Sequence, residues 1–122
     1  VVTVGSDVVI ELLEIVPRLR KGVLVHVHDI FTPAEYPREA VLNNLWFWAE
    51  QYMLEALLTS NREFKVLFGC SAMAVLEPQI LEQTFPGWAT SYARMPARTR
   101  RFLPTPDRKR VWPSSFWMLK TE

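Results

Sequence analysis

The stretch VLVHVHDIFTPAEYP, Val23 to Pro37, begins as an apolar strand and ends as a loop. The range Val23 to His28 is nearly all apolar and rich in β-branched residues, which is typical of a strand covered on both faces, as in a parallel sheet. Two ionisable residues, His28 and Asp29, follow at the exit of this strand. Ligands of open α/β sheets bind beyond the carboxyl ends of the strands, so the exit is a candidate functional site.

Helices are predicted on both sides of this strand. Ser6 is a suitable N-cap for the first helix, which Pro17 weakens. Its apolar stripe follows the i, i+3, i+4, i+7 spacing: Val9, Leu12, Leu13 and Val16. The range from Arg38 to Ser60 is predicted to be one long helix. We expect its buried stripe to comprise Leu42, Leu45, Trp46, Ala49, Met53, Ala56 and Leu57.

Two further strands are predicted, at Phe64 to Phe68 and at Ser115 to Leu119. Between them lie a weaker helix from Ala72 to Gln83, broken or kinked at Pro78, and a long irregular region from Phe85 to Pro113. The alternation of helices and strands favours an α/β layer sheet. A sheet of only three strands, covered on both faces, leaves bare edges, so we expect the chain to be part of something larger.

Composition limits the classes of function. The 122 residues suit one small domain, and a formal net charge of +1 gives no argument for a dedicated nucleic-acid or membrane binder. The single cysteine, Cys70, cannot form an internal disulfide, which fits a reducing compartment. No apolar run approaches the roughly 18 residues of a membrane helix. We therefore expect a cytoplasmic protein without a membrane span.

The runs GSDVVIELLEIVPRLRKGVLVHVHDIFTPAEYP, WAEQYMLEALL, FKVLF and SSFWMLK together resemble the C-terminal half of class I S-adenosylmethionine-dependent methyltransferases. They resemble in particular a bacterial branch with HDIF and EYP after strand five. The resemblance covers Gly5 to Lys120 and is weakest from about Pro86 to Pro113. It implies a partial Rossmann-like sheet in which Val23 to His28 is strand five and Phe64 to Phe68 is strand six. Strand seven, Ser115 to Leu119, would lie between them and antiparallel to both.

The family's methyl-donor site does not have its usual signature here. The donor normally binds a glycine-rich turn after strand one, whereas the four glycines of this chain, at positions 5, 22, 69 and 87, form no such cluster. We therefore expect residues 1–122 to be the C-terminal half of a methyltransferase domain without its donor-binding half. The resemblance implies S-adenosylmethionine as the cofactor of the complete domain and a small-molecule acceptor. The chain alone is expected to be inactive and to bind the donor weakly or not at all.

His28 and Asp29 are the candidate catalytic residues. An imidazole at the strand exit could remove a proton from an acceptor hydroxyl or amine, and the aspartate could bind substrate or a divalent cation. A cation would need more ligands, so we assign no metal site. The structural alternative is that Asp29 caps the loop and His28 bonds a backbone carbonyl. His26 lies deeper on the same face, and we expect it to be a core histidine.

Tyr36 and Glu50 are the candidate substrate-binding residues. Tyr36, in the loop after the strand, could line an acceptor pocket, although simple packing of the loop explains it equally well. Glu50 lies beside the apolar stripe of the long predicted helix and could point back toward that loop. Its alternative role is a boundary carboxylate that bonds a loop amide or an arginine.

The predicted partners follow from the bare sheet edge. We expect either a homodimer or a separate chain that supplies the missing half, unless the opening residues VVTV serve as a substitute edge strand. A second class of function is a non-catalytic, truncated assembly module that pairs through this edge. A third, less favoured, is a nucleic-acid contact through the basic and aromatic run from Arg94 to Arg110, against which the low net charge counts.

Overall fold

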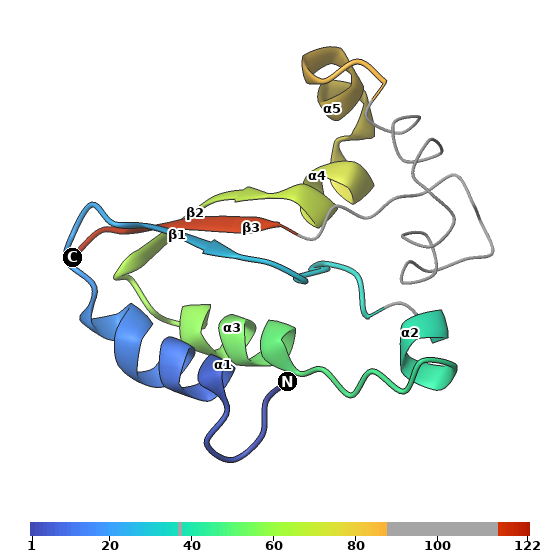
Figure 1. Ribbon diagram of the computed structural model, residues 1–122. Coiled ribbons are helices and arrows are strands. Elements are labelled where there is room, and N and C mark those ends of the chain that lie inside the picture. Colours follow the sequence, from blue (N-terminus) through green and yellow to red (C-terminus); the bar gives the residue numbers. More distant parts are fainter. Residues whose placement is uncertain (37, 88–114) are drawn as a thin grey trace. The chain divides into compact units, whose positions relative to one another are not determined.

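The computed structural model describes residues 1–36, 38–87 and 115–122 (Figure 1). The chain divides into two compact units, which we describe separately. The first unit comprises residues 1–30, 47–69 and 114–122, and the second comprises residues 31–46 and 70–113. The basic run from Arg94 to Arg110 lies outside the described residues, as does most of the predicted irregular region.

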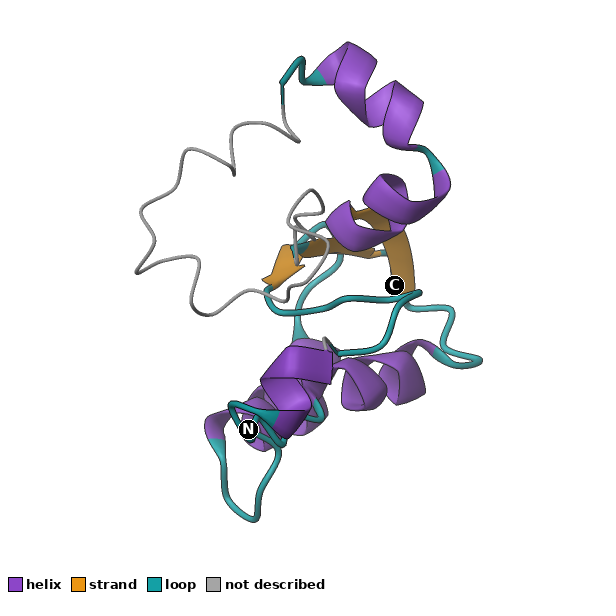
Figure 2. Ribbon diagram, turned by 90° about the vertical axis from the view of Figure 1, so that its right-hand side faces the viewer, coloured by secondary structure: helices purple, strands orange, loops and turns teal. Residues whose placement is uncertain are grey.

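The first unit contains a three-stranded sheet, drawn in orange in Figure 2. Its strands are β1 (Leu24–Val27), β2 (Phe64–Gly69) and β3 (Phe116–Lys120). The spatial order is β1-β3-β2, and β3 is antiparallel to both neighbours. The predicted central, antiparallel position of the last strand is therefore confirmed. The protein is a mixed α/β structure, and each of the three strands in the described residues lies within a residue or two of its predicted range.

A helical segment precedes β1, where one helix was predicted. It consists of α1 (Asp7–Ile10), a π-helical stretch η1 (Glu11–Ile15) and a short 3-10 turn η2 (Val16–Arg18). The π turn rotates the later side chains relative to a regular α-helix. Leu12 and Val16 are consequently buried, whereas Leu13 is 59% exposed and does not join the predicted stripe.

The single long helix predicted for Arg38 to Ser60 is wrong. The structure has two helices, α2 (Arg38–Leu42) in the second unit and α3 (Glu50–Leu58) in the first. Leu45 adopts a positive φ of 55°, and the N–H of Trp46 bonds the carbonyl of Ala40 at 3.0 Å. Asparagine side chains compete with the helix for backbone hydrogen bonds, so the Asn43-Asn44 pair explains why the helix ends there.

The interruption also changes which side chains are buried. Leu42 and Leu45, both predicted in the apolar stripe, are 56% and 62% exposed. In α3 the buried residues are instead Gln51 and Leu54, while Met53 packs partly buried against the core. The apolar spacing across the Asn-Asn pair was continuous in sequence but does not belong to one helix.

The second unit also contains α4 (Cys70–Leu76) and α5 (Pro78–Thr84). The two helices are separated at Glu77, as the break at Pro78 predicts. The Ser71 hydroxyl is buried and donates a 2.7 Å hydrogen bond to the carbonyl of Phe31. This bond joins α4 to the loop that starts the second unit.

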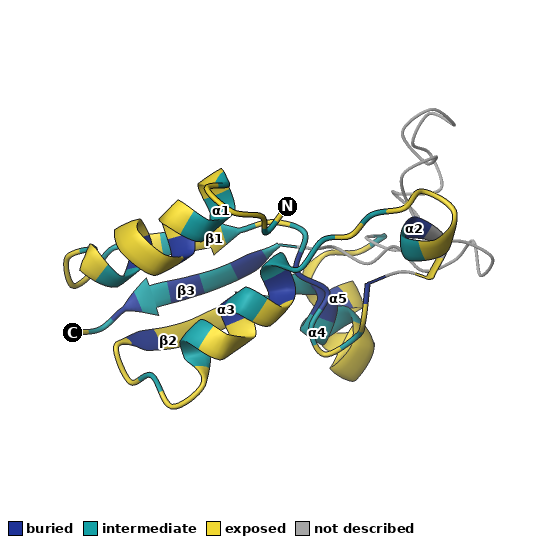
Figure 3. Cartoon of the chain, turned by 90° about the horizontal axis from the view of Figure 1, so that it is seen from below, coloured by how far each residue is buried: buried dark blue, intermediate teal, exposed yellow. Residues whose placement is uncertain are grey.

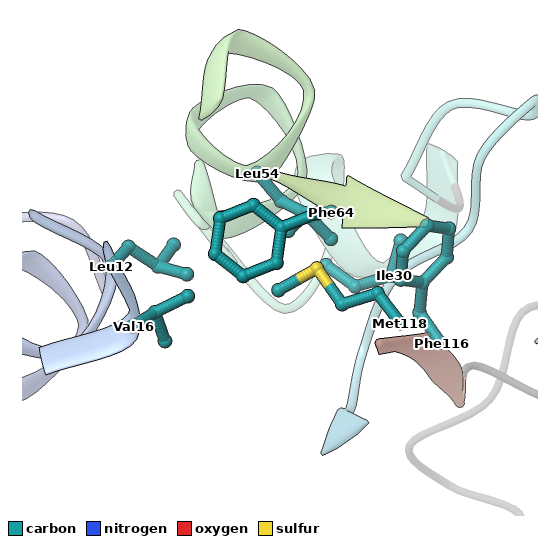
Figure 4. Close-up of a cluster of buried hydrophobic side chains, with 7 residues drawn as sticks. All are labelled: Leu12, Val16, Ile30, Leu54, Phe64, Phe116 and Met118. Atoms are coloured by element: carbon teal, nitrogen blue, oxygen red, sulfur yellow. The ribbon is translucent and has the colours of Figure 1, made fainter. Parts of the chain in front are cut away.

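The core of the first unit lies between its sheet and its helices. Figures 1 and 3 show α1 and α3 on the same face of the sheet. Met118, on the central strand, is fully buried and lies in the middle of the cluster in Figure 4. The cluster comprises Leu12, Val16, Ile30, Leu54, Phe64, Phe116 and Met118. Lys120 ends β3 with a buried side chain that pairs with Glu63 and lies over the Phe64 ring.

Strand β1 is covered on one face and not on both. Val25 and Val27 pack against the core, whereas Leu24 is 52% exposed and His26 is also exposed. Two expectations are therefore wrong: that both faces of this strand are covered, and that His26 lies in the core. Their physical reason is the same: β1 is an edge strand whose side chains alternate between a helix-covered face and an open face.

Candidate functional site

His28 and Asp29 form a hydrogen-bonded pair directly after β1. Asp29 adopts a positive φ of 60°, a conformation that Asp and Asn tolerate better than most residues. Its carboxylate oxygen Oδ2 lies 2.9 Å from Nδ1 of His28. In the tautomer that makes this bond, Nδ1 donates and the other ring nitrogen, Nε2, carries the lone pair. The His28 side chain is 80% exposed, so that nitrogen is accessible.

A cavity of about 600 Å³ lies beside this pair in the first unit. The helical segment α1–η1 forms one wall, and β1 with its exit forms another. The lining residues are Val1, Asp7, Val8, Glu11, Leu12, Ile15, Val16, Val25, His26, Val27, His28, Asp29, Trp48 and Glu50. The cavity thus brings together three of the four candidate site residues, namely His28, Asp29 and Glu50.

Glu50 begins α3 and is held by several donors. Its carboxylate accepts a 2.9 Å hydrogen bond from the N–H of Ala49 and lies 2.6 Å from the amino group of Val1. Burial raises the pKa of Glu50, but the hydrogen bonds from the Val1 amino group and the backbone amides outweigh it. The net pKa lies below the ordinary value, so Glu50 is an anion at neutral pH. The contact with the Ala49 amide matches the structural alternative for Glu50, and the carboxylate also lines the cavity.

Tyr36 is placed differently. It belongs to the second unit, is only 8% exposed, and packs edge-to-face on Phe31 with ring centroids 5.6 Å apart. Tyr36 is not among the residues that line the cavity. This packing agrees with its alternative role in the loop, and a role in substrate binding stays a prediction.

Sequence reasoning missed three residues that line the cavity, Asp7, Glu11 and Trp48. Asp7 and Glu11 are four residues apart, and this spacing on a predicted helix places two carboxylates on one face. That signal was present in the sequence. His26, expected in the core, instead lines the cavity and stacks on Trp117 with ring centroids 4.4 Å apart.

Metal ligation has no visible basis in the described ranges. Within residues 1–36, 38–87 and 115–122, no three His, Cys, Asp or Glu side chains gather where they could hold an ion. None of the helices in those ranges has both the length and the apolar character needed to cross a membrane.

The site is therefore an exposed imidazole–carboxylate pair on the rim of a mixed apolar and acidic cavity. A paired imidazole with one free nitrogen can take a proton from a bound ligand. In comparisons with known proteins, no family model, curated protein or solved structure matches this chain.

Proposed function

We propose that the three strands and their helices are the C-terminal part of an S-adenosylmethionine-dependent methyltransferase domain that acts on a small-molecule acceptor. The observation that carries the proposal is the strand order β1-β3-β2, with the last strand of the chain inserted antiparallel in the middle. This is the arrangement that the resemblance implies for strands five, seven and six. An insertion of this kind is a specific feature of topology, because sequential strands are more often neighbours.

In this proposal His28 and Asp29 act on the acceptor. Nε2 of His28 removes the proton from the acceptor's oxygen or nitrogen, which leaves that atom with the electron pair it needs as a nucleophile. Asp29 holds the imidazole through Nδ1 and stabilises the imidazolium that forms. Asp29 is therefore a positioning residue, and His28 is the group that touches the substrate.

The described residues contain no recognisable site for the methyl donor. Of the four glycines, Gly5 and Gly22 lie in turns at the two ends of the segment α1–η2, and the described residues contain no glycine-rich turn that could cradle a nucleotide-like donor. The described residues do not fit S-adenosylmethionine by themselves, and no step of the mechanism is assigned to it.

A first prediction concerns the donor. Calorimetric titration of residues 1–122 with S-adenosylmethionine should give weak binding or none, because the described part of the chain has no donor cradle. A dissociation constant in the low micromolar range would contradict this, since the chain would then hold a complete donor site.

A second prediction tests the activity. The product of the full open reading frame that encodes these residues should transfer a labelled methyl group from S-adenosylmethionine to some member of a panel of amines and hydroxyl compounds. In that protein, His28→Asn should lower kcat/KM by about 10²–10⁴-fold, the usual contribution of a general base. Glu14→Gln, an exposed change on η1 outside the cavity, is the control. An unchanged kcat/KM in His28→Asn would show that His28 has no part in the mechanism. The absence of any methyl transfer by the full protein would contradict the proposed methyltransferase activity.

The open edge of the sheet supports a second candidate function, a non-catalytic assembly module. Among the described residues, strand β1 pairs only with β3, and the opening residues Val1 to Val4 form no strand. Ile10, Leu13 and Ile15 on the neighbouring helical segment are 45–59% exposed. An apolar edge of this kind invites another strand, and a second copy of the chain is the simplest occupant because most oligomers are symmetric. In this candidate function the chain self-associates through the edge of β1.

A further inference from the structure

The cavity beside β1 has an apolar body and an excess of negative charge over the single positive charge of the Val1 amino group. Most of its apolar lining comes from the helical segment and β1, with Leu12, Ile15, Val16, Val25 and Val27 among the side chains. Four carboxylates accompany them: Asp7, Glu11, Asp29 and Glu50. Of the residues that the structure describes, neither a lysine nor an arginine lines the cavity. The volume of about 600 Å³ is in the range of small-molecule sites.

We propose that this cavity binds a small protonated amine that carries an apolar group. The inference names the acceptor class for the site described above, and as a statement about catalysis it rests on the proposed methyltransferase function. As a statement about binding it rests on the cavity alone.

The distribution of groups in the cavity suits such a ligand better than a neutral or anionic one. An ammonium group gains from the surrounding carboxylates, while a carboxylate or phosphate ligand would be repelled by them. The aliphatic wall covers the apolar part of the ligand. The Val1 amino group pairs with Glu50 alone, and no lysine or arginine of the described residues lines the cavity, so its lining keeps an excess of negative charge.

The His28–Asp29 pair gives this ligand a chemical role. A protonated amine has no free electron pair and cannot attack an electrophile. Transfer of one ammonium proton to Nε2 of His28 breaks the N–H bond and leaves its electron pair on the amine nitrogen, while the imidazole becomes an imidazolium beside the Asp29 carboxylate. The same residues that attract the cation thus accept the positive charge when the proton moves.

The test compares two probes of the same shape on residues 1–122 without any methyl donor. NMR titration at low salt should give a dissociation constant for 2-phenylethylamine about tenfold lower than that for 2-phenylethanol, and added salt should reduce the difference. Glu11→Gln should weaken binding of the amine about two- to fivefold and leave the alcohol unchanged. Glu14→Gln is the matched control, because Glu14 lies on the same π-helical stretch but does not line the cavity.

Each outcome decides a separate point. Equal affinity for the two probes, or equal effects of Glu11→Gln and Glu14→Gln, overturns the inference. Preference for the amine with the predicted response to Glu11→Gln supports it, even if the full protein transfers no methyl group, in which case only the methyltransferase proposal fails. If the full protein transfers methyl groups to neutral acceptors and the cavity does not prefer the amine, the methyltransferase proposal stands and the inference about the amine is wrong.

Discussion

Replacing Met118 with alanine should lower the free energy of unfolding by about 2–5 kcal/mol, the usual cost of truncating a large buried side chain. Met118 has no exposed surface, lies on the central strand, and is paired with Val25 on one side and Val66 on the other. Its removal leaves a cavity where the sheet meets the helices (Figure 4). Small domains are stable by only about 5–15 kcal/mol, so a large part of the stability would be lost.

Urea denaturation followed by circular dichroism measures this change. Met118→Leu keeps the volume of the side chain and should cost less than about 1.5 kcal/mol. Leu119→Ala, one residue further on the opposite face of β3, is the second control and should also cost less than Met118→Ala. If Met118→Ala were no more harmful than Leu119→Ala, the cluster around Met118 would not be the core of the first unit.

The strands could be predicted because each is a short apolar run with turn residues on both sides. The apolar character of residues 116–119 was enough to predict a strand there. Its central position came from the family resemblance, and the pairing of β3 with β1 and β2 confirms it. The same apolar character led to the wrong expectation that other elements cover both faces of β1. An apolar run does not reveal whether a second layer lies over it, and β1 leaves Leu24 and His26 exposed.

The errors in the helices have a different origin. Apolar spacing is read over long windows, whereas a helix ends through local backbone competition at one or two residues. At Asn43-Asn44 the spacing continues into Leu45 and Trp46, yet the backbone turns through a positive φ. In the first helix, the π turn moves Leu13 out of the stripe without any signal in the apolar pattern.

For the candidate site, sequence reasoning found the residues that a strand exit presents and missed those that come from another element. His28 and Asp29 follow β1 directly, so fold class alone identified them. Asp7 and Glu11 reach the same cavity from the helical segment, and their relation to β1 depends on packing that no local pattern encodes. The acidic character of the cavity could therefore be recognised only after the first unit was seen folded.

The largest effect outside stability is expected on self-association through the edge of β1. The N–H of Lys120 donates to the carbonyl of Val23 at 3.0 Å, and the ladder continues with Val25 paired to Met118. Because residues of an antiparallel strand alternate in the direction of their hydrogen bonds, Val25 faces β3 while Leu24 and His26 turn their N–H and C=O groups to the other side, where no described strand pairs with β1. A second copy can pair with those groups, and light scattering at micromolar concentration should then give about twice the 14.2 kDa of one chain.

His26→Pro removes one outward N–H without breaking the ladder to β3, and proline on an edge strand blocks a partner strand. We expect this variant to be folded and monomeric, with a dissociation constant for the dimer raised by about 100-fold, the equivalent of roughly 3 kcal/mol. His26→Ala loses the imidazole and its stacking on Trp117 but keeps the N–H, and it should remain dimeric. Val25→Pro removes an inward N–H and should unfold the first unit. A wild-type chain that scatters as a monomer, or a His26→Ala variant as monomeric as His26→Pro, would show that the backbone edge of β1 does not hold two copies together.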